Sequence, residues 1–364
     1  MPGGMQLKYE VLANSTCALC GACLDWCPYI ANIEDHLVLR FDCNVEHGRC
    51  YSVCPRTFAD WQAISEKYLP DAPQNVEIGP YFDVYKVKAA QSINGQQDGG
   101  TVSHLVKTIM ENELVQTVLL TGSNDNITPL PFLTAEAADI EKAAGSRFLA
   151  SPSLRKVIEA QENKVEKMAV VGRPCQIQAM RKLDYNRRPD KPPMEVLTIG
   201  IFCMWSLGWE FKDYLESKFP GEKVLGMEIP QDGFIVKTDK GEHVLPLEEV
   251  KKFNKPGCGY CLDMTAELAD ISVGAFEAEK GWNTVILRSL KGRELLEQAQ
   301  EKGYLICEPF PEDELVRLKG ASLGKKSRNL DNIQAAFDRG VKPFIDLESD
   351  MYKQIREVAE GMVK

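Results

Sequence analysis

Apolar residues recur at regular intervals after about residue 85, and their spacing predicts an alternation of helices and strands. The stretch from Asp98 to Leu114 opens with paired glycines and sets Leu105, Ile109 and Met110 at helical intervals, which predicts a helix. Short and nearly continuous apolar runs predict buried strands over residues 115–122, 167–175, 194–203, 267–276 and 281–289. A further helix is expected over 292–303. Strands that alternate with helices predict an α/β fold for this part of the chain.

The remaining patterns divide the chain into parts. Residues 226–247 alternate between apolar and polar positions, which predicts a β-hairpin, and helices are expected in the C-terminal tail. The stretch from Tyr68 to Tyr81 is rich in proline and polar residues, which is typical of a linker. The sequence therefore predicts a small N-terminal domain over residues 1–70, a linker over 71–84 and a larger domain over 85–364.

Charge and hydropathy limit what the chain can bind. Its 364 residues carry a formal net charge of −10, which disfavours broad binding to nucleic acid or to an anionic membrane, because both require a basic face. No apolar run reaches the length of a membrane span, and the N-terminus has no apolar core of a signal peptide. We therefore expect a cytoplasmic protein without a membrane span.

The number and clustering of the cysteines give the strongest indication of function. Seven of the twelve cysteines lie within residues 17–54, which indicates metal ligation in a reducing compartment rather than disulfides. The run CALCGACLDWCP matches the pattern C-x2-C-x2-C-x3-C-P of bacterial iron–sulfur proteins. The run NVEHGRCYSVCP aligns with it without a gap, so that Cys50 falls on Cys23 and His47 falls on Cys20. This internal repeat predicts a ferredoxin-like module with two clusters.

The spacing also assigns ligands to the two clusters. In such a repeat, the cysteine that precedes proline binds the other cluster. The first cluster is therefore expected to use Cys17, Cys20, Cys23 and Cys54. The second cluster is expected to use Cys27, Cys43, Cys50 and one further group.

His47 occupies the position of the missing cysteine, and three interpretations of this position remain open. Imidazole can bind iron, so His47 can be the fourth ligand. Alternatively, the second cluster has three irons or a solvent ligand, and His47 only hydrogen-bonds a sulfide. Zinc bound by Cys43, His47 and Cys50 is the third interpretation, which the proline after Cys54 and the intact first run disfavour.

Four of the other cysteines are dispersed along the larger domain. Cys258 and Cys261 form a C-x2-C pair beside glycines. Cys175 and Cys203 follow two predicted strands, which is where open α/β sheets bind ligands. These four residues can form one more cluster, or Cys175 and Cys203 can be core thiols. Cys307 lies in an expected strand and is interpreted as a plain buried residue.

Seven stretches, in order along the chain, resemble one known family. They are DGGTVSHL, GSRFLASPSL, VVGRPCQIQAMRKL, IGIFC, PGCGYCLDM, ADISVGAF and TVILRS. Together they are similar to the beta subunit of coenzyme F420-reducing hydrogenase and its relatives, the family of F420 hydrogenase/dehydrogenase beta subunits. The resemblance covers roughly residues 85–310 and implies FAD, one four-iron cluster and hydride exchange with the deazaflavin F420. The ferredoxin-like N-terminus of this chain resembles the arrangement in family members that feed electrons into larger redox complexes.

The resemblance also implies roles for single residues. The cysteines that match those of the family's internal cluster are Cys175, Cys203, Cys258 and Cys261. The residues that match positions near the flavin are Gly99, Gly100, Thr101, Ser103, Ser146, Arg147, Gly274, Thr284 and Arg288. The alternatives are an N-cap for Thr101 and a solvated strand-end charge for Arg288. The chain departs from the family where Ala275 and Phe276 follow Gly274, since an acidic residue is common there.

These observations together define the expected fold and function. The expected fold is a ferredoxin-like α+β module with two 4Fe–4S clusters, followed by an α/β flavin-binding domain with an embedded third cluster. The expected function is that of an F420-linked oxidoreductase subunit, in which FAD converts hydride into single electrons. The expected partner is a redox complex of the hydrogenase, formate dehydrogenase or heterodisulfide reductase type.

Two other functions remain open at this point. One is a ferredoxin-dependent flavin reductase of an organic substrate, and the other is a pure electron-transfer protein. No motif identifies the residues that contact F420, and no protein general base is expected. His36, His104 and His243 are interpreted as surface or structural residues, with a flavin contact by His104 as the alternative.

Overall fold

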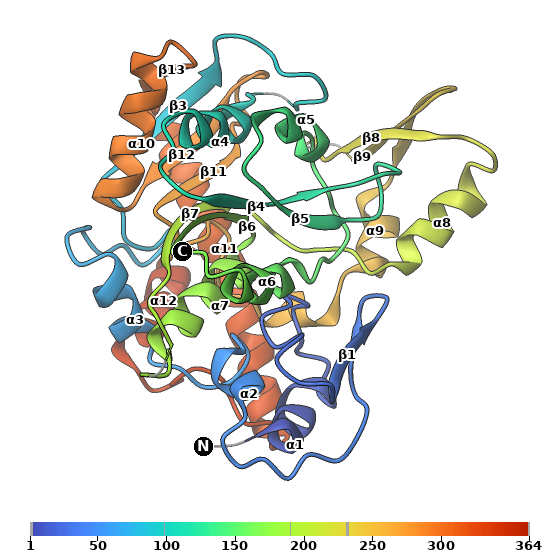
Figure 1. Cartoon of the computed structure of the whole chain (residues 1–364), viewed down its shortest axis with the longest axis vertical. Helices are drawn as coiled ribbons and strands as arrows, with labels where there is room; N and C mark the ends of the chain where they lie inside the picture. The colour runs from blue at the N-terminus through green and yellow to red at the C-terminus, as the bar shows by residue number, and fades with distance from the viewer. Residues whose placement is uncertain (1–2, 98, 190, 231–232, 363–364) are drawn as a thin grey trace.

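An eight-stranded mixed β-sheet forms the centre of the molecule (Figure 1). The structure, a computed structural model, describes residues 3–97, 99–189, 191–230 and 233–362. In order across the sheet the strands are β13 (Leu305–Pro309), β3 (Asp83–Ala89), β12 (Asn283–Leu287), β11 (Ile271–Ala275), β7 (Glu195–Ile201), β6 (Lys167–Gly172), β4 (Thr117–Gly122) and β5 (Leu130–Thr134). Strands β11, β7, β6 and β4 are parallel, whereas β5 at one edge and β12, β3 and β13 at the other run antiparallel to their neighbours.

The apolar runs of the sequence become central strands because these strands are covered on both faces. In β6, for example, Met168 and Val170 belong to one apolar core, and Ala169 belongs to the other. All five strands predicted from such runs are confirmed, within narrower limits than the sequence suggested. The expected α/β architecture is thus confirmed as one large mixed sheet.

Two long helices, α4 (Thr101–Glu111) and α10 (Leu290–Glu301), pack together on one face of the sheet, with the short α5 (Ile140–Ala143) beside α4 (Figure 1). Leu105 and Ile109 of α4 and Leu295 of α10 are buried in the core of this face. Both predicted helices are therefore confirmed. Asp98, where the predicted segment of α4 began, lies outside the described residues.

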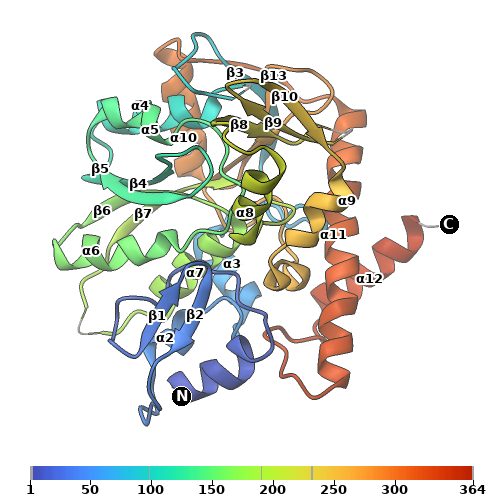
Figure 2. The same cartoon turned by 90° about the vertical axis from the view of Figure 1, so that its right-hand side faces the viewer.

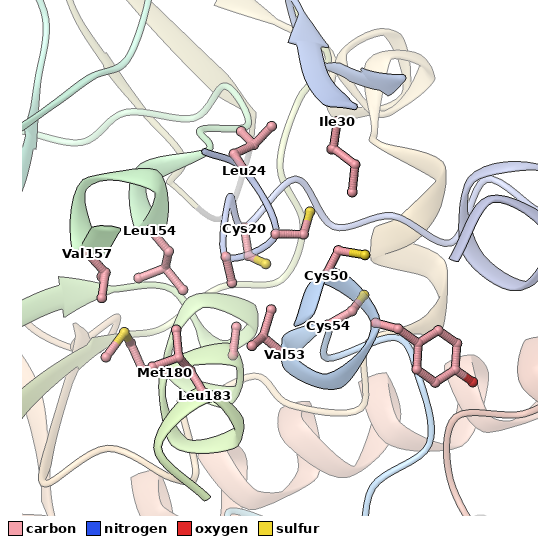
Figure 3. Packing of buried hydrophobic residues seen from close by; sticks show 14 of the residues in the cluster. Cys20, Leu24, Ile30, Cys50, Val53, Cys54, Leu154, Val157, Met180 and Leu183 are labelled. Carbon is pink, nitrogen blue, oxygen red and sulfur yellow. The ribbon is translucent and has the colours of Figure 1, made fainter. Parts of the chain in front are cut away.

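The N-terminal segment packs against the other face through α7 (Pro174–Tyr185) and α6 (Lys156–Glu162) (Figure 2). Its elements are α1 (Gly4–Leu7) with a π-helical continuation (Lys8–Leu12), β1 (Ile30–Ile33), β2 (His36–Leu39), α2 (Arg49–Val53) and α3 (Trp61–Tyr68). Cys20, Cys50 and Cys54 of this segment share one apolar core with Met180 and Leu183 of α7 (Figure 3). The segment therefore shares its core with the larger α/β part.

Residues 69–82 have no helix or strand but are tied to distant parts of the chain. The linker expected over residues 71–84 falls on them except for its last two residues, which begin β3. Thr265 Oγ1 donates a hydrogen bond to the carbonyl oxygen of Ile78 (3.0 Å). Ser322 Oγ donates one to the carbonyl oxygen of Glu77 (2.6 Å). These contacts fix the course of the segment over the surface of the larger part.

A second sheet and the C-terminal helices complete the fold. The second sheet is antiparallel, in the order β10 (Gly241–Leu245), β9 (Phe234–Thr238) and β8 (Val224–Glu228), so the predicted hairpin is confirmed and gains a third strand. It shares an apolar core with α8 (Glu210–Lys218) and α9 (Leu247–Val250). The predicted C-terminal helices are α11 (Glu312–Asp338) and α12 (Asp350–Met362). Short 3-10 turns cover Ala137–Asp139, Ser153–Arg155, Lys251–Phe253 and Pro256–Tyr260. In the part of the chain that the structure describes, no helix combines the length and the apolar character that a membrane span requires.

Candidate functional site

Four cysteines of the N-terminal repeat line one cavity with mostly apolar walls. They are called the first set below and are Cys17, Cys20, Cys23 and Cys54. Gly21 shapes the loop that carries three of them, since its φ is +89° and a Cβ there would lie 2.2 Å from the carbonyl oxygen of Pro152. The structure thus brings together the four residues that the sequence predicts as ligands of the first cluster.

The other three cysteines of the repeat form the second set, which lies nearer the surface. They are Cys27, Cys43 and Cys50. The pKa of Cys50 is raised to about 11, first by burial and then by the charges of Cys27 and Cys43, with a smaller effect of Cys54 from the first set. Cys27 is exposed and Cys43 is half-buried. His47 is exposed in the loop between Cys43 and Cys50, and its part as a fourth ligand stays a prediction.

The four dispersed cysteines also come together and form the third set. Cys175 lies in the first turn of α7, Cys203 follows β7, and Cys258 and Cys261 lie on and directly after the turn over residues 256–260. Burial raises the pKa of Cys203 to about 12, with further contributions from Cys258 and Cys175. Burial likewise raises the pKa of Cys175 to about 11, with contributions from Cys261 and Cys258. These mutual effects show that the four thiols share one neighbourhood.

Cys261 differs from the other buried cysteines in its acidity. Burial alone would raise the pKa of its thiol, but the positive charges of Lys325 and Arg56 lower it below the ordinary value. The thiolate is the form of cysteine that binds metal. The third set therefore has two buried cations that favour its ligand form.

Two side chains of α11 hold the backbone of the third set. Lys325 Nζ donates a hydrogen bond to the carbonyl oxygen of Cys203 (2.6 Å). Asn329 Nδ2 donates to the carbonyl oxygens of Cys258 (3.0 Å) and Cys261 (2.7 Å). The strand end and the turn are thus fixed relative to each other by one helix.

The first and third sets are in direct contact. Cys175 is the foremost charged neighbour of Cys20, whose pKa is raised well above its ordinary value mainly by burial. The backbones also touch, because a Cβ at Gly257 would lie 2.2 Å from the carbonyl oxygen of Cys17. Since Cys50 of the second set shares one apolar core with cysteines of the first, the three sets form one continuous series, with the most exposed cysteine, Cys27, in the second set.

The residues expected near a flavin gather where α4 begins. Gly99 and Gly100 have φ values of +87° and +61°, which glycine adopts readily, and they lead the chain into α4. Thr101 N donates a hydrogen bond to Oδ1 of Asn283 at the start of β12 (3.2 Å). The N-cap residue is Gly100, so the interpretation of Thr101 as an N-cap is wrong. Ser103, two residues further on, is half-buried on α4.

A second loop lies against this one. Ser146 Oγ donates a hydrogen bond to Gln97 Oε1, which joins the loop over residues 144–147 to the glycine loop. Arg147 donates to the carbonyl oxygen of Ser146 (3.1 Å). Gly274 and Thr284 are paired across β11 and β12, next to Asn283. Two loops, the first turn of α4 and one pair of strands therefore hold eight of the nine residues expected near the flavin.

Arg288 lies apart from this group, beyond the other end of β12. Its side chain is fully buried, which lowers its pKa to about 10. It donates hydrogen bonds to the carbonyl oxygen of Pro80 (2.7 Å), to Ser272 Oγ (2.8 Å) and to Thr265 Oγ1 (2.8 Å). The interpretation as a solvated strand-end charge is therefore wrong, and a flavin contact by Arg288 stays a prediction.

The other histidines have ordinary surroundings. His36 is exposed in β2. His104 is buried, with Nδ1 at 2.9 Å from the carbonyl oxygen of Gly100. His243 Nε2 lies 2.8 Å from a carboxylate oxygen of Glu222. These contacts are of the kind expected for surface and structural residues.

Comparison with known proteins places this geometry in a family. The profile of the coenzyme F420 hydrogenase/dehydrogenase beta subunit matches in both its parts, the N-terminal part over residues 84–158 and the C-terminal part over residues 165–313. One component of the F420H2 dehydrogenase of Methanosarcina mazei is 30% identical over 84% of this chain and 89% of its own length. The chain belongs to the family of coenzyme F420 hydrogenase/dehydrogenase beta subunits.

Two further relatives differ from this chain in length and in the part of it that they match. Coenzyme F420-dependent sulfite reductase of Methanocaldococcus jannaschii is 29% identical over 90% of the chain, and the chain spans about half (53%) of its length. A chain in the solved F420-reducing NiFe hydrogenase complex of Methanosarcina barkeri superposes with a TM-score of 0.66 and 27% identity, covering 72% of this chain and 96% of that one. The N-terminal repeat and α11 beyond residue 313 lie outside both family profiles, whereas all four cysteines of the third set lie within the second.

The residues of this chain fit the iron–sulfur clusters and the flavin that the family resemblance implies. Thiols are the ligands of iron–sulfur clusters, and the first set lines a cavity while the third set contains a thiol of lowered pKa. Thr101 Oγ1 is buried without a hydrogen-bond partner among the described residues, at a glycine-opened helix start of the kind that favours a phosphate group. Over the described ranges, no three His, Cys, Asp or Glu side chains are arranged to hold a single metal ion.

The sequence did not point to the buried cations around the cysteines. Lys182 of α7 donates hydrogen bonds to the carbonyl oxygens of Cys54 and Thr57 (both 2.7 Å), and burial lowers its pKa to about 8. Arg56 lies beside both the first and the third set. Arg56 follows a cysteine–proline pair directly, and this position could have indicated that it lies near the cysteines. Lys182 lies in an ordinary helical pattern, which gives no such indication.

Proposed function

We propose that this chain is the iron–sulfur flavoprotein subunit of an F420-linked oxidoreductase, which exchanges hydride with coenzyme F420 and passes single electrons to or from a partner redox complex. The observation that supports this proposal best is the continuous series of three cysteine sets. A hydride-transferring protein without a relay needs no such series.

The proposed reaction balances in electrons and protons. Reduced F420 gives up two electrons and two protons overall, and the partner receives the two electrons singly. FAD supplies the conversion between hydride and single electrons, and four-iron clusters carry one electron at a time. The relatives named after F420 support this choice of hydride carrier.

The chain's own residues have three tasks in this proposal. The glycine loop and the loop over residues 144–147 hold the flavin, with the start of α4 directed at its pyrophosphate. The three sets hold one cluster each. The second set includes the most exposed cysteine, and the third lies on the flavin side, because Gly274 abuts the ring of Phe202, the residue before Cys203. The surface position of the second set makes it the exit to a partner.

The test is an anaerobic mixture of purified, flavin-loaded protein with reduced F420, followed by absorbance. The expected result is the return of the oxidised deazaflavin band together with bleaching of flavin and clusters. If flavin and clusters are intact and dithionite reduces them but F420 does not, the proposal is wrong. In that case, ferredoxin-driven reduction of another substrate is the next assay.

A pair of variants separates flavin reduction from the relay. Cys175→Ser should leave the flavin reducible by F420 but slow the bleaching of the first and second clusters. Cys307→Ser is the matched control, because Cys307 is a half-buried cysteine of β13 outside the three sets. Equal bleaching in both variants would contradict the relay.

A further inference from the structure

Arg56 is a buried arginine between two cysteine sets. It follows Cys54-Pro55 in the chain and retains only 4% of its accessible surface. Arginine stays protonated in proteins, so a positive charge lies inside the molecule at this point. A buried charge is costly unless opposite charge or hydrogen bonds compensate it.

On one side Arg56 faces the first set. It lines the same cavity as Cys17, Cys20, Cys23 and Cys54. Its charge acts against the effect of burial on Cys17 and Cys54, whose pKa values burial raises. Its backbone N–H also points to Cys54 Sγ, at 3.4 Å.

On the other side Arg56 faces the third set. Arg56 lines a second cavity together with Tyr260, the residue directly before Cys261. Cys261, Cys175 and Cys258 raise the pKa of Arg56 above the ordinary value, although burial alone would lower it. Arg56 in turn contributes to the lowered pKa of Cys261. One guanidinium therefore interacts with thiols of two sets.

The guanidinium is not fully satisfied by the protein. Its Nε and Nη2 atoms are buried and have no hydrogen-bond partner among the described residues. The ring of Phe344 lies with its centroid 5.0 Å from the guanidinium carbon and covers one side. Unpaired buried donors are expensive, so they indicate a partner that binds at the cysteines.

We propose that Arg56 is a positioning residue shared by two clusters, whose fixed charge raises the reduction potential of both and whose free N–H groups bond to their sulfurs. The proposal rests on the proposed function only in that the first and third sets each hold a cluster. Reduction adds negative charge to a cluster, and a nearby cation stabilises the reduced state. Because one cation acts on both clusters, their potentials shift together and electrons can pass in either direction.

Lys325 provides an internal comparison. It is also buried and cationic, and its Nζ donates to the carbonyl oxygens of Cys203 (2.6 Å) and Asp263 (2.8 Å). The cysteines near its charge all belong to the third set. Loss of Lys325 should therefore change the third cluster alone. Loss of Arg56 should change two clusters.

The experiment is a potentiometric titration, monitored by electron paramagnetic resonance, of the full chain and its variants Arg56→Met, Arg56→Lys, Lys325→Met and Arg317→Met. Iron and sulfide contents are measured first. In Arg56→Met, the equilibrium constant for reduction should fall about tenfold for the first cluster and for the third. This fall lowers each reduction potential by about 59 mV for one electron. Arg56→Lys should recover most of this shift, Lys325→Met should move only the third cluster, and the exposed Arg317→Met should move none.

Each outcome decides between the two proposals. If the parent protein binds no iron, the proposed function fails and the Arg56 proposal fails with it. If the variants load iron and Arg56→Met has the parent's potentials, only the Arg56 proposal is wrong. If Arg56→Met does not load iron, Arg56→Gln and Arg56→Lys are compared instead. Equal potentials in those two variants overturn the role of the charge, and a lower potential in Arg56→Gln supports it.

Discussion

The first and second cysteine sets come from two copies of one sequence motif but lie in different surroundings. The first set lines a cavity, contacts the third set and faces Arg56. The second set contains an exposed cysteine and a half-buried one. Gly21 of the first copy is wedged against Pro152, in the larger part of the chain, whereas Gly48 of the second copy abuts Gly3, near the start of the chain.

This difference shows that a repeat fixes spacing but not environment. The local loops are similar because the same cysteine intervals produce them. The burial of the first set comes instead from α7 and from the turn over residues 256–260, which are distant in sequence. A buried set and a more exposed set fit the proposed relay of electrons between a flavin and an external partner.

The largest expected effect on the free energy of unfolding comes from breaking the ion pair that holds α7, the helix against which the first set packs. Asp270 and Arg181 form a buried ion pair (3.0 Å) that ties α7 to the sheet. In Asp270→Asn the arginine stays buried without its partner, which should lower the free energy of unfolding by about 4 kcal/mol. Urea unfolding of the purified protein measures this change. The control Glu195→Gln removes a half-exposed partner of Lys291 and should cost less than about 1 kcal/mol.

The same carboxylate should make the protein sensitive to acid. Burial alone would raise the pKa of Asp270, but Arg181 and Thr198 lower it below the ordinary value. A carboxyl whose folded pKa is depressed stabilises the fold above its ordinary pKa, and this stabilisation disappears as the pH falls through the folded value. Urea midpoints measured from pH 7 downward should therefore fall more steeply for the parent protein than for Asp270→Asn. Parallel curves would show that Asp270 does not contribute to the loss of stability in acid.

Adding one methyl group beside each set tests whether the backbone around the first set is packed more tightly than the backbone around the second. In Gly257→Ala the new Cβ would lie 2.2 Å from the Cys17 carbonyl oxygen, between two segments that cannot move apart freely. We expect a loss of about 3 kcal/mol in unfolding free energy and, if the first and third sets hold clusters, a loss of their iron. In Gly48→Ala the overlap is smaller, because the Cβ would lie 2.7 Å from its nearest atom, Cα of Gly3, so the loss should stay near or below about 1 kcal/mol. Similar losses in both variants would remove the distinction.

Two cations offer a comparison of smaller size. Lys182→Met leaves the carbonyl oxygens of Cys54 and Thr57 without their buried donor and should cost about 2 kcal/mol. Arg155→Met breaks a bond to Asp25 beside the second set (2.9 Å), but both side chains are more than one-third exposed. It should cost less than about 1 kcal/mol. Thermal unfolding of both variants at one pH measures the difference, and the reverse order would contradict it.

The smallest effect concerns rates rather than stability. If each set holds a cluster, an iron chelator added under anaerobic conditions should remove the iron of the second set first, because that set contains the exposed Cys27. Absorbance of the iron–chelator complex should then show a fast phase that corresponds to one cluster and a slower remainder. Release in a single phase would mean that the two copies of the motif protect their iron equally.

Much of the fold follows from patterns in the sequence. The buried strands were predictable because strands covered on both faces have continuous apolar runs, as β6 and β7 do. The proximity of Cys17, Cys20 and Cys23 was predictable because their spacing is local. The convergence of Cys175 and Cys203 was predictable only in outline, from the rule that parallel strands end at the same edge.

The buried cations were not predictable from spacing. Lys182 bonds to a carbonyl group 128 residues away, and Lys325 bonds to one 122 residues away. Backbone carbonyl groups are present at every residue, so nothing in the sequence marks which of them will meet a lysine. The burial of Arg288 escaped prediction for the same reason, since its acceptors lie in three separate segments.

The position of α11 has a consequence for how the protein is made. This helix runs along the side of the molecule, and its Lys325 and Asn329 hold the carbonyl groups of the third set (Figure 2). During synthesis, the ribosome adds these two residues long after Cys261. The turn that carries Cys258 and Cys261 therefore reaches its final shape only after residue 329 has emerged. If the third set holds a cluster, its surroundings would thus be complete only once this helix has been made, rather than when the four cysteines first emerge.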